Sequence, residues 1–266
     1  MQDPRPIYMD YSKRLVKLVK ELDKIIKEEL DLKEIEKRGK LDSERMDSIA
    51  DLIQIIFNAI RSRFYKEPLS GDSEPSKTFF KRFINRKIIE PVQKQVDSWQ
   101  IRHFTKEFRK VQGVDPFLND PRLNDVMGLF RKANVDLITS IPELHLSKIE
   151  TIVTEGHRGG DSIKTISEKI REVSAVTKKR ARFIARDQVA KLNGQLEYVR
   201  ATRNGIDSYI WRANIDARLR KDHRHLDGTV QSWAERPITN DQGDRNHPGE
   251  DYNCRCVAEN IYTDIS

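Results

Sequence analysis

The sequence predicts a mainly α-helical protein, with an elongated helical N-terminal part followed by a small α+β module near the C-terminus. Two patterns lead to this prediction. As far as Gly205, apolar residues recur at three- and four-residue steps among Lys and Glu, which is typical of amphipathic helices. After Gly205, short strand-like runs flank a polar stretch of about forty residues, which is longer than most loops of a compact domain.

Three long helices are expected in the first half of the chain. Apolar periodicity places them at about 10–38, 46–64 and 77–110. The segment 68–76, rich in Pro, Gly and Ser, separates the second helix from the third. Pro91 should kink or divide the third helix, because proline has no N–H to give to the helical hydrogen bonds.

The second half is expected to continue with shorter helices and to end with two strands. The helices are predicted at 122–140, 142–155, 161–173 and 177–204. The runs 208–212 and 256–262 contain β-branched and aromatic residues, which predicts strands. We therefore expect a helical, charged N-terminal region at 1–140 and a C-terminal domain at 141–266.

Composition excludes several classes of protein. Apolar residues make up 37% and charged residues 34% of the 266 positions, and the net charge is +7. A mild positive excess is compatible with a polyanionic partner without proving one. No apolar run approaches the 18 or more residues of a membrane span, and the polar start does not resemble a secretory signal. Two cysteines cannot build a disulfide-rich scaffold. We expect a protein made in the cytoplasm with no membrane partner.

Histidine and cysteine gather near the C-terminus. Cys254 and Cys256 form a C-x-C sequence, and residues i and i+2 of a strand project to the same face, so both sulfurs could meet one metal ion. His223 or His225, together with His247, would complete a tetrahedral set of two sulfurs and two nitrogens suited to Zn²⁺. The alternative is two half-buried thiols and three solvated histidines in a loop.

An alternative interpretation, as a metal-dependent nuclease or toxin-like enzyme, centres on His223. Carboxylates and cations alternate from Asp216 to His223, and a histidine with Asp and Asn neighbours is typical of a general base or a metal-dependent nuclease. The alternative is a charged loop whose ion pairs contribute little individually.

A run of cations between residues 171 and 191 suggests contact with nucleic acid. Its candidate residues are Lys178, Lys179, Arg182 and Arg186. Positions 178, 182 and 186 share one helix face and would contact phosphates without reading sequence. The alternative is the solvent side of an amphipathic helix.

An ordered series of short motifs resembles a known family. The residues D-x-R-x-R-x-x-H-x-x-L-D-G occupy 216–228, H-P-G occupies 247–249 and N-C-R-C occupies 253–256. Over roughly 145–262, this series resembles the C-terminal domain of the phage Mu F-like minor head proteins, which are head-morphogenesis proteins of tailed bacteriophages. Each motif alone is weak, but their order is specific.

The resemblance implies a virion component rather than an enzyme. Such a protein would act with the portal protein and with capsid or scaffold proteins in procapsid assembly and in DNA packaging or delivery. It would lie in the head interior or near the portal, and in the host cytoplasm during assembly, with only nonspecific DNA contact. The matching positions are Asp216, Arg218, Arg220, His223, Leu226, Asp227, Gly228, Asn253, Cys254 and Cys256. The match favours His223 over His225, so His223, His247, Cys254 and Cys256 are the hypothetical zinc ligands of a structural core.

Overall fold

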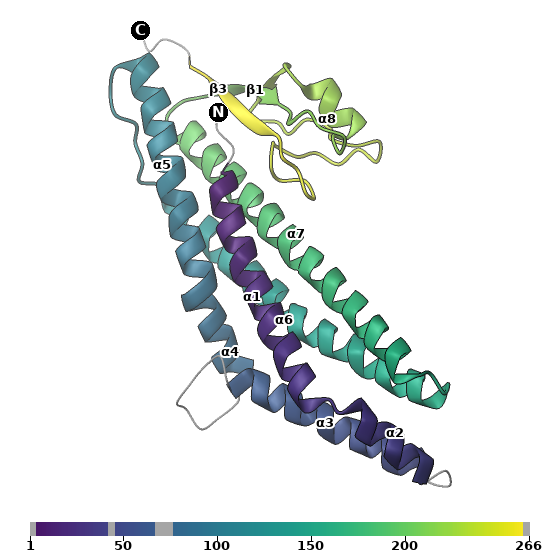
Figure 1. The fold of residues 1–266 in the computed structure, drawn as a ribbon. Coiled ribbons are helices and arrows are strands. Elements are labelled where there is room, and N and C mark those ends of the chain that lie inside the picture. The colour runs from purple at the N-terminus through teal and green to yellow at the C-terminus, as the bar shows by residue number, and fades with distance from the viewer. Residues whose placement is uncertain (1–3, 42–45, 67–76, 263–266) are drawn as a thin grey trace. The chain divides into compact units, whose positions relative to one another are not determined.

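The computed structural model describes residues 4–41, 46–66 and 77–262. Within these residues the chain is mainly helical, and a three-stranded antiparallel sheet lies near its C-terminus (Figure 1). The predicted fold class is therefore confirmed. The expected break at 68–76 lies outside the described residues. None of the described helices is long and apolar enough to cross a membrane.

The first expected helix is in fact two helices, α1 (Arg5–Glu29) and α2 (Leu32–Leu41). The Asp31 side chain separates them: its Oδ1 accepts hydrogen bonds from the backbone N–H groups of Lys33 and Glu34, at 3.0 and 3.2 Å. A carboxylate in this position caps the start of a helix, so the chain begins a new helix instead of continuing the old one. The next helix, α3, spans Met46–Lys66.

The third expected helix is divided as predicted. It consists of α4 (Lys77–Ile84), a π-helical turn η2 (Asn85–Ile89) and α5 (Glu90–Gln112). Pro91 stands in the first turn of α5, where its missing N–H costs no helical hydrogen bond. The π-helical turn η2 therefore ends where α5, the helix that contains Pro91, begins.

Two expected breaks do not occur. Residues Pro121–Arg158 form one helix, α6, although Pro142 lies inside it, and Ile163–Arg203 form one helix, α7. In α6 the proline is buried, and packing of this stretch offsets the hydrogen bond that the proline removes. The expected break in α7 near residue 175 contains neither Gly nor Pro, and the hydroxyl of Thr177 donates to the Val173 carbonyl at 2.9 Å.

Contacts between residues divide the chain into two compact units. Unit 1 comprises 1–11, 89–134 and 183–266, and unit 2 comprises 12–88 and 135–182. The limits between them fall within α1, η2, α6 and α7. The domain boundary expected after residue 140 lies inside α6. It separates regions of the sequence rather than units defined by contacts, so it stays a prediction.

A partly buried polar cluster joins three helices of unit 2. Asp23 of α1 accepts hydrogen bonds from His145 Nε2 of α6, at 3.1 Å, and from Ser174 and Lys178 of α7, at 2.6 Å each. Burial alone would raise the pKa of Asp23, but these hydrogen bonds outweigh burial and lower the pKa to about 2. Lys178, a predicted phosphate contact, is therefore held by a carboxylate.

The sheet of unit 1 has the strand order β2-β1-β3. Its strands are β1 (Ser208–Arg212), β2 (Val230–Ser232) and β3 (Val257–Ile261), and a short helix, α8 (Lys221–Leu226), stands between β1 and β2. The first and last strands along the chain, β1 and β3, were expected. The short β2 and α8 were not, because three and six residues are too few to show a period. Buried residues of the sheet pack with Phe104 and Phe108 of α5 and Ala201 of α7.

Candidate metal centre

Three side chains from the polar stretch meet in the C-terminal module. His223 lies on α8, and Cys254 and Cys256 lie just before β3; all three are buried, and both thiols are free. The His223 Nδ1 atom is 3.6 Å from Cys254 Sγ and 3.4 Å from Cys256 Sγ. The strand was expected to begin at Cys256 and begins at Val257, so neither cysteine lies on it, but the two sulfurs converge as expected. In the described part of the chain, these three residues form the group able to hold a metal ion.

A carboxylate that was not among the expected site residues lies beside this group. Asp251 Oδ2 lies 3.2 Å from His223 Nε2 and accepts a hydrogen bond from Arg220 at 2.6 Å. The other Asp251 oxygen accepts the backbone N–H of Tyr252. Asp251 belongs to no recognisable motif, since it stands in a polar segment between the H-P-G and N-C-R-C sequences.

The three buried groups shift one another's pKa values. The pKa of the Cys254 thiol lies well below its usual range, mainly because Cys256 hydrogen-bonds to it, and His223 adds to this effect against burial. The hydrogen bond to Cys254 and burial raise the pKa of Cys256. Burial acts to lower the pKa of His223, but the contact with Cys254 outweighs it and raises the pKa. The arrangement favours a thiolate at Cys254, which the contacts with Cys256 and His223 stabilise.

His247 is not part of this group, contrary to the expected ligand set. It is buried elsewhere in unit 1, where its Nδ1 lies 3.0 Å from the Tyr209 hydroxyl and its ring packs edge to face on Trp233, with centroids 4.9 Å apart. Burial lowers its pKa. His247 is thus a core residue, while His225 is exposed on α8.

The D-x-R motif and the L-D-G motif shape the loops around the site. Asp216 accepts the backbone N–H of Arg218 at 2.8 Å and two hydrogen bonds from Arg255, the residue between the cysteines. These bonds hold the pKa of Asp216 well below its usual range. Asp227 accepts the backbone N–H of Ala213 at 2.8 Å, and Gly228 adopts a left-handed conformation with φ of 78°. The carboxylates therefore fix loop geometry.

The remaining motif positions join the module to α7 and to the core. Asn253 has a positive φ of 54°; its side chain accepts a hydrogen bond from Arg186 at 2.9 Å, and its backbone N–H donates to Asp187 at 2.6 Å. Arg220 bonds to Asp251 and to the Tyr252 carbonyl. Leu226 packs against the core of the module, and the Arg218 side chain is exposed.

The H-P-G sequence lies directly on α7. A Cβ atom at Gly194 would come within 2.5 Å of the Pro248 carbonyl oxygen, and one at Gly249 within 2.8 Å of the Ala190 carbonyl oxygen. Gly249 also has a φ of 90°. Only glycine allows both backbones to approach so closely. The H-P-G sequence is recognisable in the chain, but its partner, Gly194, is not.

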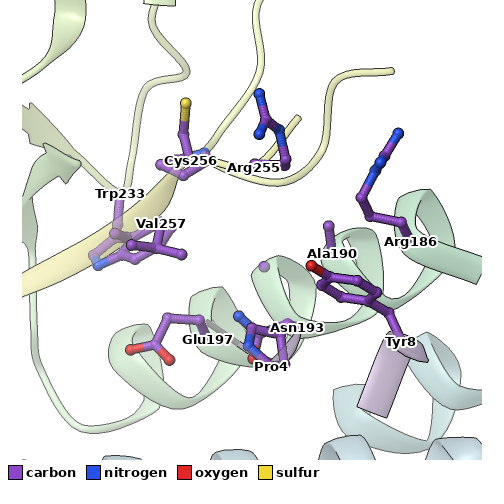
Figure 2. A pocket seen from close by; sticks show the side chains of 13 residues that line it. Pro4, Tyr8, Arg186, Ala190, Asn193, Glu197, Trp233, Arg255, Cys256 and Val257 are labelled. Carbon is purple, nitrogen blue, oxygen red and sulfur yellow. The ribbon is translucent and has the colours of Figure 1, made fainter. Parts of the chain in front are cut away.

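A pocket of unit 1 lies beside the site. Figure 2 shows Asn193 and Glu197 of α7 on one side of it, and on the other the chain from Arg255 to Val257, with the Cys256 sulfur directed away. Glu197 is fully buried, which raises its pKa to about 7 although Gln100 and Asn260 donate hydrogen bonds to it. The pocket is thus separate from the thiols.

The predicted cationic stripe is only partly available to a ligand. Lys178 pairs with Asp23 at 2.6 Å, and Arg186 bonds to Asn253. Lys179 and Arg182 are exposed.

Comparison with known proteins supports the similarity seen in the motifs. Residues 147–259 match the model of the family described as "Phage Mu protein F like protein". The chain is also 37% identical over 139 residues to an uncharacterized protein of Haemophilus influenzae (strain ATCC 51907 / DSM 11121 / KW20 / Rd). That match covers 52% of this chain and 30% of the relative. No solved structure matches the chain.

Proposed function

We propose, from the match of residues 147–259 to the phage Mu protein F-like family, that the protein is a minor head protein of a tailed bacteriophage. It acts with the portal protein and with capsid or scaffold proteins in procapsid assembly and in DNA packaging or delivery. Its place is the virion, in the head or near the portal, after assembly in the host cytoplasm. The family match is the observation that carries this proposal.

Contact with DNA is secondary in this proposal. The net charge of +7 favours association with a polyanion, and Lys179 and Arg182 are exposed members of the cationic run. Such cations bind phosphates without sequence preference, and binding releases counterions. A protein packaged together with DNA needs no sequence-specific contact.

The geometry of His223 supports a structural role over the alternative of a nuclease. Its side chain is buried, Nδ1 faces the two cysteine sulfurs and Nε2 faces Asp251. A general base needs a ring nitrogen within reach of the substrate proton. Both nitrogens of His223 are instead directed at protein atoms.

Co-purification with the portal protein of the same phage tests the proposal. The tagged chain and the untagged portal protein are expressed together, and the portal protein should be retained on the affinity resin after a high-salt wash. The matched control is the tagged chain with an unrelated phage's portal protein. Failure to retain its own portal protein, together with cleavage of plasmid DNA in the presence of Mg²⁺ or Mn²⁺, would contradict the proposal and favour the nuclease.

A further inference from the structure

The chemistry of the three converging side chains selects a particular kind of ligand. Two cysteine sulfurs and one imidazole nitrogen lie within 4.8 Å of one another in a buried site. Thiolate and imidazole are the donors that Zn²⁺ prefers, whereas Mg²⁺ and Ca²⁺ take oxygen ligands. We propose that His223 Nδ1, Cys254 Sγ and Cys256 Sγ bind one Zn²⁺ ion, with a water molecule as fourth ligand and Asp251 as the positioning residue.

The distances between the donor atoms match a tetrahedral zinc site. With Zn–S near 2.3 Å and Zn–N near 2.0–2.1 Å, tetrahedral angles separate sulfur from nitrogen by about 3.6 Å. The two observed separations between His223 Nδ1 and the sulfurs are 3.6 and 3.4 Å. The ion therefore fits with little movement of the side chains.

Asp251 prepares the imidazole for a metal ion. An ionised carboxylate only accepts hydrogen bonds, so the Nε2 atom that faces Asp251 carries the ring proton. In the neutral ring this leaves the Nδ1 lone pair directed at the two sulfurs. Zinc-binding histidines generally have such a partner on the other nitrogen, which fixes the ring's tautomer and orientation.

The Nδ1 atom of His223 cannot accept hydrogen bonds from both thiols. The Nδ1 atom has one lone pair, while two thiols lie within 3.6 Å of it, so at most one of them can donate well. The backbone N–H of Cys256 also points at Cys254 Sγ, at 3.4 Å. Such a contact stabilises a thiolate, which is the form that binds zinc. A metal ion satisfies all three donor atoms at once.

The fourth position faces an open pocket. The three ligand residues line it together with the polar or charged residues Asn214, Arg218, Arg220, Asn253 and Arg255. Among the described residues no fourth His, Cys, Asp or Glu joins the group. Solvent therefore supplies the last ligand, as in zinc sites with three protein ligands.

Metal analysis of the full chain tests the ligand set. The wild-type protein, purified under reducing conditions, should contain about one zinc per chain. Cys254→Ser and Cys256→Ser should lose it, while His225→Ala, on the exposed side of α8, and His247→Gln should keep it. Circular dichroism of each variant reports whether the chain is folded. Absence of zinc and of Co²⁺ binding in the folded wild-type protein, or zinc retained by the folded double Cys→Ser variant, would overturn the proposal.

Asp251→Asn tests the positioning role without removing a ligand. The zinc affinity of this variant, measured by competition with a chromophoric chelator, should fall about 10–100-fold. Asp241→Asn, at an exposed position of the same module, is the matched control and should not change the affinity. An unchanged affinity for Asp251→Asn would contradict the positioning role.

Co²⁺ substitution reports the fourth ligand. The visible bands of the Co²⁺ protein should shift when azide is added, because azide replaces a water ligand. Near-ultraviolet charge-transfer bands should show two thiolates. A spectrum that azide does not change would mean that a protein side chain holds the fourth position and would overturn that part of the proposal.

Discussion

Individual side chains of this protein have roles that only the fold can assign. Asp216 has the appearance of a catalytic carboxylate in the sequence, yet it accepts a backbone N–H group and shapes a loop, as Asp227 of the L-D-G motif also does. His247 was expected beside the cysteines, but it packs against Tyr209 and Trp233. Glu197, which was not among the expected site residues, is a buried acid with a raised pKa.

Glu197 should make folding depend on pH in the opposite direction to most carboxylates. Its pKa rises from 4.5 to about 7 on folding, so the folded state binds a proton that the unfolded state has lost. This contribution to the free energy of unfolding is complete below pH 4.5 and falls as pH rises to 7, by on the order of 3 kcal/mol. Urea unfolding of the wild type and of Glu197→Gln across this range checks the prediction. The free energy of unfolding of the variant should not show this fall between pH 4.5 and 7. A fall equal to that of the wild type would contradict the role of Glu197.

At the scale of elements, the amphipathic patterns predicted which segments are helical better than where the helices end. The division just before Pro91 was predictable, because proline is best accepted in the first turn of a helix. The break at Asp31 was missed because it depends on one side chain folding back onto the backbone. The long α6 and α7 were divided wrongly, because packing overrides a local signal such as Pro142.

The candidate site was predictable only in part. Residue chemistry and spacing identified His223, Cys254 and Cys256, because both the C-x-C sequence and the motif order are visible in the chain. Asp251 and Gly194 were not predictable. Their roles depend on α8 and the H-P-G segment being brought to their positions by contacts between residues far apart in sequence.

The close approach of the H-P-G segment to α7 can be tested with a matched pair of glycines. Gly194→Ala should lower the free energy of unfolding by about 1–3 kcal/mol, because its Cβ would clash with the Pro248 carbonyl oxygen. Gly128→Ala in α6 is the control: its Cβ meets nothing within 4 Å, and alanine's helix propensity should stabilise it by up to about 1 kcal/mol. Denaturant unfolding measures both. Equal effects of the two substitutions would contradict the close approach.

For the whole molecule, the excess of positive charge predicts weak, salt-sensitive binding to DNA. Replacing both Lys179 and Arg182 by Gln should weaken binding to any duplex sequence and reduce the slope of log affinity against log salt by about 2. Fluorescence anisotropy with labelled DNA at several salt concentrations measures this. Lys178→Gln, whose wild-type side chain is paired with Asp23, should have a smaller effect. A larger effect of Lys178→Gln would contradict the assignment of Lys179 and Arg182 as the residues that contact DNA.

The family match leads to one central proposal, that the protein is a component of phage heads. Quantitative mass spectrometry of procapsids and mature virions, purified from the phage that encodes this chain, tests it most directly. The protein should be present in procapsids in far fewer copies than the major capsid protein, and deleting its gene should reduce the number of DNA-filled heads. Its absence from both particles, with normal heads after deletion, would contradict the account.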